Sequence, residues 1–460
     1  MKTTEKKITS GLAPQEVAAE LAPLVDFQPA GLPLDELQQL FRERLVPHFV
    51  DYGHPGFHSL YNFFLEPGAD LGATLAQVHN QGVTNWQVSP GGVMLEELCC
   101  QALCRLFGLG PKAEGTFMFS GTYANQQAIY LALHRRAEQC GFDFAVEGLN
   151  GFDDPRRLAL VASEEAHFSL RQTLRMMGLG ETCLHTVRAD ARRRMDSRAL
   201  ARKLAELRES HDIFCVVATA GTSSIGSIDP LDDVLEQCRD LATWVHLDGA
   251  YGLIYSLLEE KQDLFPGIGH FDSIIWDPHK QFGVPIPSSL IFLKDGADFQ
   301  RMAIYSDYFN RKQEREPNPG LKSPPSTRPL SALPLVAALR HQGLDGIKAR
   351  LRAPLSVVAR AVDYVTDHGE LELMLPPDLG IFCVRVQPAG LAPEVLNDLQ
   401  QYLYQRVIRE GRRSVSLTVI EDRAALRFLI LSPATRLADI IDTFDYLLEI
   451  ARDFNYPGKK

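Results

Sequence analysis

Short apolar runs alternate with amphipathic stretches through the middle of this chain. Between about residues 95 and 291, the runs LALVA (158–162), IFCVVATA (213–220), WVHLD (244–248) and SIIWD (273–277) are separated by segments with helical spacing of apolar residues. Continuous apolar runs of this length are typical of strands that are buried on both faces, and strands alternating with helices are typical of parallel sheets. The pattern predicts an α/β domain with a largely parallel, buried sheet.

The regions on either side of this domain have different patterns. Residues 34–46 carry apolar side chains at helical spacing until Pro47 interrupts them, which predicts a helical arm. Beyond about residue 335, long helical patterns alternate with the runs IFCVRV (381–386) and LRFLIL (426–431), which predicts a compact α+β domain. We therefore expect an arm over residues 1–94, a large domain over 95–334 and a small C-terminal domain over 335–460.

The stretch between Asp307 and Pro334 belongs to neither pattern, because it is polar and rich in proline. Its length and composition predict a long loop rather than a packed element. A functional lid and a disordered segment are both compatible with this composition, and we expect a mobile lid.

Composition and charge narrow the range of partners. The 460 residues carry a formal net charge of -11, so the chain lacks the basic character that nucleic acids and anionic membrane surfaces require, and a small-molecule substrate fits better. The eight cysteines show no CxxC or Cys/His zinc spacing, which favours reduced core thiols over a metal site or disulfides. The N-terminus has no apolar signal segment, and no run approaches the ~18 apolar residues of a membrane span, so we expect a cytoplasmic protein.

Two charged residues follow apolar runs in positions where they could take part in catalysis. Lys280 ends the motif DPHK, where a desolvated amine could form an imine, although a surface lysine is the simpler alternative. Asp248 ends WVHLD and is followed by small residues. A carboxylate buried there needs a cationic partner, for which a protonated pyridine nitrogen is suitable, and a strand-capping aspartate is the alternative.

Two further segments carry candidate cofactor-binding residues. Ser120, Gly121 and Thr122 precede an amphipathic helix, and free N–H groups at a helix N-terminus bind phosphate, although an ordinary helix cap has the same composition. His167 follows LALVA, where its ring could stack on a flat cofactor or serve a structural purpose. Together the four segments supply an imine-forming amine, a pyridinium counter-ion, a phosphate site and a stacking ring.

Six ordered motifs resemble those of the group II pyridoxal-phosphate decarboxylases, which include glutamate, cysteine-sulfinate, 2,4-diaminobutyrate and aromatic amino-acid decarboxylases. The resemblance extends over nearly the whole chain, from His54 to Pro433. The motifs are SPGGVMLEE (89–97), FSGTYAN (119–125), AHFS (166–169), ATAGTSSIGSIDP (218–230), HLDGAYG (246–252) and WDPHK (276–280).

The resemblance implies pyridoxal 5'-phosphate as cofactor and a fold-type I, transferase-like architecture, with a mostly parallel seven-stranded sheet covered by helices on both faces. It also implies an intimate homodimer whose active sites lie at the interface, with the N-terminal arm buried against the partner. The implied activity is decarboxylation of an L-amino acid to the amine and carbon dioxide.

The resemblance also assigns roles to individual residues. Lys280 forms the Schiff base, Asp248 keeps the pyridine nitrogen protonated, and His167 stacks on the ring. Arg427 grips the substrate carboxylate, with Trp86 and Pro90 as further substrate contacts, and Tyr308 is the loop tyrosine that protonates Cα. The remaining cofactor contacts are Ser120, Gly121, Thr122, Thr219, Ala250 and His279.

Several alternatives stay open at this point. The same scaffold supports carbon–carbon lyases, desulfurases and oxidative aldehyde synthases. A catalytically silent binding relative is a further alternative, against which the joint retention of Lys280, Asp248, His167 and Arg427 argues. Gly249 and Ser120 depart from the alanine and glycine that are usual in the family. SPGGVMLE with Val93 resembles members acting on acidic substrates, whereas Trp86 and HPGFH (54–58) resemble those acting on aromatic ones.

Overall fold

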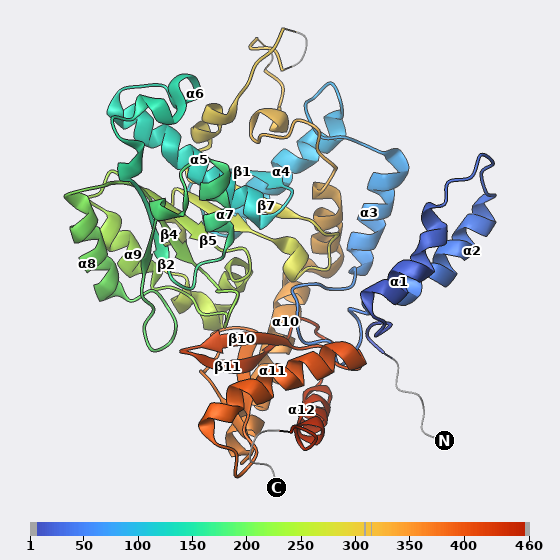
Figure 1. Ribbon diagram of the computed structural model, residues 1–460. Helices are drawn as coiled ribbons and strands as arrows, with labels where there is room; N and C mark the ends of the chain where they lie inside the picture. Colours follow the sequence, from blue (N-terminus) through green and yellow to red (C-terminus); the bar gives the residue numbers. More distant parts are fainter. Residues whose placement is uncertain (1–6, 308–309, 314, 456–460) are drawn as a thin grey trace. The chain divides into compact units, whose positions relative to one another are not determined.

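The computed structural model describes residues 7–307, 310–313 and 315–455. The chain divides into two compact units (Figure 1). The first comprises residues 1–63, 352–376 and 380–460, and the second comprises 64–351 and 377–379. The second unit therefore starts about thirty residues before the large domain that the sequence suggested, because residues 64–94 are grouped with the central sheet.

The second unit is built around a seven-stranded sheet with the order β1-β7-β6-β5-β4-β2-β3. β7 is antiparallel to both of its neighbours, whereas β6, β5, β4, β2 and β3 are mutually parallel. Successive side chains of a strand point to opposite faces, and every residue of β2, β5, β6 and β7 is buried, so both faces are covered. The predicted mostly parallel, buried sheet is confirmed. The strands are β1 (Glu114–Met118), β2 (Leu158–Ser163), β3 (Leu184–Val187), β4 (Asp212–Thr219), β5 (Trp244–Asp248), β6 (Ser273–Trp276) and β7 (Ser289–Leu293).

Helix α5 (Gly121–Cys140) is the helix that matters most for the site, because it packs against β1, β4, β5, β6 and β7. Its buried side chains are mainly alanine, leucine and isoleucine, and Gly141 ends it in the left-handed conformation with φ 90°. The last helix of the unit, α10, departs from helical geometry at Gly343. The other helices of this unit are α3 (Pro67–His79), α4 (Pro90–Leu106), α6 (Phe144–Glu147), α7 (Ser169–Met176), α8 (Ser197–Arg208), α9 (Leu231–Cys238) and α10 (Ala332–Asp367), which continues into the first unit.

The proline-rich stretch after Asp307 is anchored over its second half. Arg328 is buried and forms an ion pair with the buried Glu96 of α4, and its guanidinium also donates to the carbonyls of Pro319 (2.8 Å) and Phe117 (3.0 Å). Lys322 bridges carboxylates that belong to α4 and β1. Two charged side chains therefore tie residues 318–331 to α4 and β1, and the mobility expected of this stretch remains a prediction.

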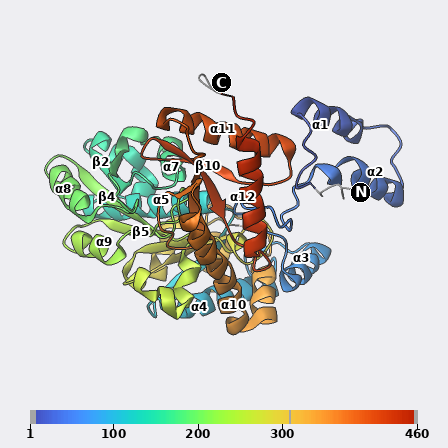
Figure 2. The same cartoon turned by 90° about the horizontal axis from the view of Figure 1, so that it is seen from below.

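The first unit contains a four-stranded antiparallel sheet with the order β10-β11-β9-β8. Helices α11 and α12 pack against it, as Figure 2 shows from below. The predicted helical arm is present as α1 and α2. Within the described residues, no helix is long and apolar enough to cross a membrane. The elements are α1 (Pro14–Leu21), α2 (Leu34–Arg44), β8 (Leu371–Leu373), β9 (Ile381–Val386), α11 (Pro393–Glu410), β10 (Ser416–Ile420), β11 (Arg423–Leu429) and α12 (Leu437–Ala451).

Candidate active site

The register of the central sheet places Thr219 and Asp248 side by side at the C-terminal ends of β4 and β5. Both side chains are buried. The Asp248 carboxylate accepts the backbone N–H of Ala250 (3.2 Å) with Oδ1 and the side-chain amide of Asn125 (2.9 Å) with Oδ2. Ligands of open α/β sheets collect outside the carboxyl ends of strands, so this edge is the expected place for a site.

Lys280 lies at the same edge, in the short 3-10 helix Pro278–Lys280 that follows β6. Its Nζ is 3.2 Å from Oδ2 of Asp277, and Oδ1 of Asp277 accepts the hydroxyl of Ser289 (2.5 Å). The side chain of Asp277 is 4% exposed and that of Lys280 is 17% exposed. Desolvation of the amine was expected from the sequence, and the structure also gives this amine a carboxylate partner.

The N-terminus of α5 meets the requirements of a phosphate site. Ser120 caps the helix by accepting the N–H of Tyr123 (3.3 Å), and the 20-residue helix directs its positive dipole end toward this turn. A Cβ on Gly121 would lie 2.8 Å from Oδ2 of Asp277, so only glycine fits. Gly121 thus sits directly against the carboxylate that pairs with Lys280.

His279 and Ser288 offer further groups near this turn. His279 Nδ1 donates to the carbonyl of Ser288 (2.6 Å), and burial lowers the pKa of His279. The hydroxyl of Ser288 is buried without a partner among the described residues. Ser288 and Phe119 line a cavity of about 720 Å³, which therefore opens beside the N-terminus of α5.

His167 is half-buried and electrostatically coupled to the strand-end residues. Its Nδ1 accepts the backbone N–H of Ser169 (3.2 Å), which leaves Nε2 to carry the proton of the neutral ring. Burial lowers the pKa of His167, Asp248 and Asp277 oppose the lowering, and Lys280 adds to it. His167 therefore lies within electrostatic range of Asp248, Asp277 and Lys280.

These groups fit the pyridoxal phosphate that the resemblance implies. A carboxylate suits the ring nitrogen, an amine suits the aldehyde, and a helix N-terminus with an adjoining unpaired hydroxyl suits the phosphate. Gly249, the departure from the usual alanine, also has a local cause. A Cβ there would lie 2.9 Å from the carbonyl of Ile275.

Arg427 belongs to the first unit, where it lies on β11. Its Nη1 donates to the carbonyl of Ser59 (2.8 Å), and its guanidinium carbon is 5.2 Å from the centroid of the Tyr61 ring. The Nε and Nη2 atoms are buried without a partner among the described residues. A buried guanidinium with unused donors suits a carboxylate ligand.

The remaining residues assigned from the resemblance lie in varied settings. Trp86 is 41% exposed and lines a separate cavity of about 250 Å³, and Pro90 is exposed at the first turn of α4. Val93 is fully buried in α4 and is therefore a core residue. Tyr308 lies outside the described residues.

Sequence reasoning missed three buried polar residues around Asp248 and Lys280. Asn125 and Asp277 stood inside quoted motifs but received no role, and His246 was treated as part of an apolar strand. Alternation along WVHLD could have identified His246, because it places Trp244, His246 and Asp248 on one face of β5.

Comparison with known proteins gives a consistent result. Residues 19–387 match the family model described as "Pyridoxal-dependent decarboxylase conserved domain". An L-2,4-diaminobutyrate decarboxylase of Acinetobacter baumannii is 27% identical over 436 residues, covering 92% of this chain and 85% of the relative. The cysteine sulfinic acid decarboxylase of Mus musculus is 28% identical over 446 residues, covering 93% of this chain and 88% of the relative.

Solved structures agree with this result. A crystal structure of mouse CSAD matches with a TM-score of 0.90 at 26% identity and covers 98% of this chain and 94% of the mouse chain. A crystal structure of Rhodiola rosea 4-hydroxyphenylacetaldehyde synthase matches with a TM-score of 0.85 at 18% identity and covers 98% of this chain and 94% of the Rhodiola chain. At this identity the match shows a shared fold alone.

Proposed function

The chain belongs to the pyridoxal-dependent decarboxylase family, and we propose that it decarboxylates a short polar L-amino acid with Lys280, Asp248 and His167 at the reacting centre. Pyridoxal phosphate is its cofactor and amino-acid decarboxylation is its activity, as the sequence predicted. The observation that carries the residue assignment is the Lys280–Asp277 pair beside the buried Asp248 at one edge of the sheet.

Lys280 and Asp248 would hold the two ends of the reactive part of the cofactor. Lys280 would supply the amine that holds the cofactor, and Asp277 would hold the proton that this amine gains or loses. Asp248 would keep a proton on the ring nitrogen, since a buried carboxylate is stabilised by a cation. When bound, pyridoxal phosphate supplies an electron sink for the pair left by departing carbon dioxide.

The surrounding residues would fix the cofactor's orientation. Ser120, Gly121 and Thr122 hold the phosphate through N–H groups at the start of α5, with help from His279. Thr219, Ala250 and His167 would border the ring. These residues would together fix the orientation of the cofactor.

Arg427 would bind the substrate's α-carboxylate. Its unused Nε and Nη2 donors lie next to each other on one edge of the guanidinium and match the two oxygens of a carboxylate. We also keep Tyr308 as the proposed proton donor to Cα, and Trp86 and Pro90 as proposed substrate contacts.

A short polar substrate is supported by the relatives. The relatives named for 2,4-diaminobutyrate and cysteine sulfinate are 26–29% identical over about nine-tenths of this chain, whereas an aromatic-L-amino-acid decarboxylase of Bacillus atrophaeus is 24% identical. The motif containing Val93 adds no support, because Val93 is in the core.

The test is a screen of purified holoenzyme against L-2,4-diaminobutyrate, cysteine sulfinate, glutamate, aspartate and the aromatic amino acids. Carbon dioxide, amine, aldehyde and ammonia are measured together. We expect equal amounts of carbon dioxide and amine from one short polar substrate. Preferential turnover of an aromatic amino acid would contradict the proposed class, and aldehyde with ammonia would identify an oxidative aldehyde synthase.

We further propose a homodimer. On α3, Leu71, Leu75 and Val78 are 61%, 42% and 72% exposed and follow helical spacing, so one apolar face of this helix is suited to burial by a partner. In the arm, Phe27 and Leu34 are 88% and 84% exposed. Sedimentation should give twice the monomer mass, and an active monomer at dilution would contradict the proposal.

A cytoplasmic location remains our proposal as well. All eight cysteines are thiols, and seven of them are buried, with Cys140 as the exposed exception. A reducing compartment keeps such thiols free. Fractionation with a tagged chain would test the location.

A further inference from the structure

One face of strand β5 carries three polar or aromatic side chains in a row. Trp244, His246 and Asp248 are separated by two residues each, so they project from the same side of the strand. All three are buried, and His246 is paired in register with Ser273 of β6. Helix α5 packs against this strand and contributes Asn125.

These residues form a continuous chain of hydrogen bonds that ends at Asp248. Trp244 Nε1 lies 2.7 Å from Ser273 Oγ, which lies 2.7 Å from His246 Nδ1. His246 Nε2 lies 2.8 Å from Asn125 Oδ1, and Asn125 Nδ2 lies 2.9 Å from Asp248 Oδ2. No side-chain nitrogen or oxygen of these five residues is left without a partner among the described atoms.

The chemistry of the groups allows one direction of donation. A carboxylate only accepts, so the amide nitrogen of Asn125 faces Asp248 and its oxygen faces His246. His246 must then carry its proton on Nε2. Burial lowers the pKa of His246 to about 4, so the ring is neutral and Nδ1 accepts the Ser273 hydroxyl proton. Ser273 in turn accepts from the indole of Trp244, which can only donate.

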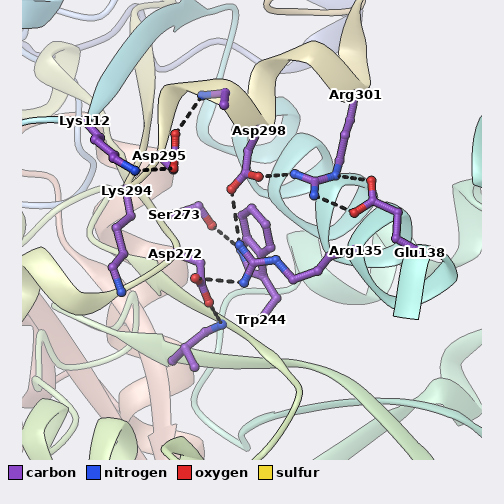
Figure 3. A network of polar contacts seen from close by, with 12 residues as sticks. Lys112, Arg135, Glu138, Trp244, Asp272, Ser273, Lys294, Asp295, Asp298 and Arg301 are labelled. Atoms are coloured by element: carbon purple, nitrogen blue, oxygen red, sulfur yellow. Dashed lines mark hydrogen bonds and ion pairs between the residues drawn. The ribbon is translucent and has the colours of Figure 1, made fainter. Parts of the chain in front are cut away.

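The far end of the chain is fixed by the same helix. Arg135 of α5 stacks over the Trp244 ring at 4.0 Å and forms ion pairs with Asp272 (2.9 Å) and Asp298 (3.2 Å), as Figure 3 shows. From Asn125 to Arg135 the helix rises about 15 Å, and from Asp248 to Trp244 the strand spans about 13 Å. α5 therefore runs along β5 and holds both ends of the hydrogen-bonded chain.

We propose that Asn125 and His246 are positioning residues that hold Asp248 as an oriented carboxylate for the ring nitrogen of the cofactor. This inference rests on the proposed role of Asp248. Because Gly121 and Asn125 are one turn apart on α5, the helix that offers the phosphate site also sets the position of the carboxylate. The spacing between the two cofactor contacts is thereby built into one rigid element.

The direction of donation can be measured in the unmodified protein. Histidine-selective ¹⁵N NMR of the holoenzyme, with the His246→Gln spectrum used to identify the signal, should show His246 as the neutral Nε2–H form. An Nδ1–H form or an imidazolium would overturn the arrangement, whatever the activity.

The effect on the cofactor is tested with Asn125→Leu, which removes the donor to Asp248 and keeps the number and branching of the side-chain heavy atoms. Gln127→Met is the matched control, because Gln127 is an equally buried amide on α5 that donates to the Lys322 carbonyl instead. Holoenzyme is reconstituted with cofactor labelled with ¹⁵N at the ring nitrogen, and the NMR shift reports whether this nitrogen is protonated.

We expect Asn125→Leu to shift the ring-nitrogen signal toward the unprotonated form and to lower kcat/KM roughly 10- to 100-fold, the effect of losing one hydrogen bond to a charged group. His246→Gln, which can still donate to Asn125, should retain more activity than His246→Leu. The proposal is overturned if Asn125→Leu and Gln127→Met give the same signal and the same kcat/KM. If Asn125→Leu does not fold, the proposal is tested by the histidine NMR measurement and by the comparison of His246→Gln with His246→Leu.

Asp248→Ala separates this inference from the proposed function. If Asp248→Ala leaves the ring nitrogen protonated, the assignment of Asp248 itself fails. If Asp248→Ala removes the proton but Asn125→Leu does not, the assignment of Asp248 stands and the positioning role of Asn125 is wrong.

Discussion

Lys280 Nζ lies 3.2 Å from Oδ2 of Asp277, the first residue of the same DPHK motif. Asp277 is in turn fixed by the hydroxyl of Ser289 and lies against Gly121 at the start of α5. The reactive amine, its carboxylate partner and the N-terminus of α5 are therefore one packed cluster. This cluster gives Asp277 a role that the sequence did not suggest.

We predict that Asp277→Asn lowers kcat on the order of tenfold or more, because it removes the charge that orients the amine while keeping the acceptor for Ser289. Steady-state kinetics of the holoenzyme measure the effect. Asp295→Asn is the control, since Asp295 belongs to an exposed ion pair with Lys112. Equal kinetics for the two variants would remove Asp277 from the mechanism.

Arg427→Met should raise KM and lower kcat/KM by roughly 10- to 100-fold, because it removes two unused donors for the substrate carboxylate. Arg423→Met on the same strand, where the arginine pairs with Glu372, should change kcat/KM little. If Arg427→Met keeps the wild-type KM, Arg427 has a structural role with Ser59 and Tyr61.

Much of this architecture was accessible from hydrophobic pattern alone. The runs at 158–162, 213–220, 244–248 and 273–277 all lie within strands of the parallel part of the sheet or at their ends, because continuous apolar runs have few alternatives. β1 and β7 were not singled out, since neither has a pattern that reveals its antiparallel pairing. The order of the strands in the sheet depends on contacts between residues far apart in sequence, which a local hydrophobic pattern does not reveal.

The site was accessible only in part, for a similar reason. Lys280, Asp248 and His167 each follow an apolar run, so the carboxyl edge of a sheet could be expected to gather them. The hydrogen bonds of Asn125 and His246 join residues more than 120 positions apart, which no local pattern reveals. Composition also did not reveal that Arg328 and Lys322 anchor residues 318–331, because the partners of both side chains lie far away in sequence.

The buried Arg328–Glu96 pair predicts a large stability effect. Arg328→Met should lower the free energy of unfolding by roughly 3–5 kcal/mol, because Glu96 is left as an unpaired buried charge. Chemical denaturation measures this loss. The double variant with Glu96→Gln should recover part of it, and an unchanged single variant would show that the pair is not formed.

His58 predicts a dependence of stability on pH. Burial lowers the pKa of His58 to about 4, with Asp439 opposing the shift and Arg413 adding to it. The unfolded chain, with a pKa near 6.5, therefore binds the proton first, and stability falls as pH drops from about 6.5 toward 4. At about pH 5 this loss is roughly 2 kcal/mol, and His58→Leu should lack it. If the free energy of unfolding of the wild type and of His58→Leu falls equally between about pH 6.5 and pH 4, His58 is not the group responsible for the loss.

The most direct test of the account is to locate the cofactor's covalent attachment. Purified holoenzyme is reduced with borohydride, digested and mapped by mass spectrometry, with Lys280→Ala as a parallel sample. We predict the cofactor's mass on the peptide that contains Lys280 and no stable label or turnover in Lys280→Ala. Attachment to another lysine, such as the half-buried Lys322, or full activity of Lys280→Ala would contradict the account.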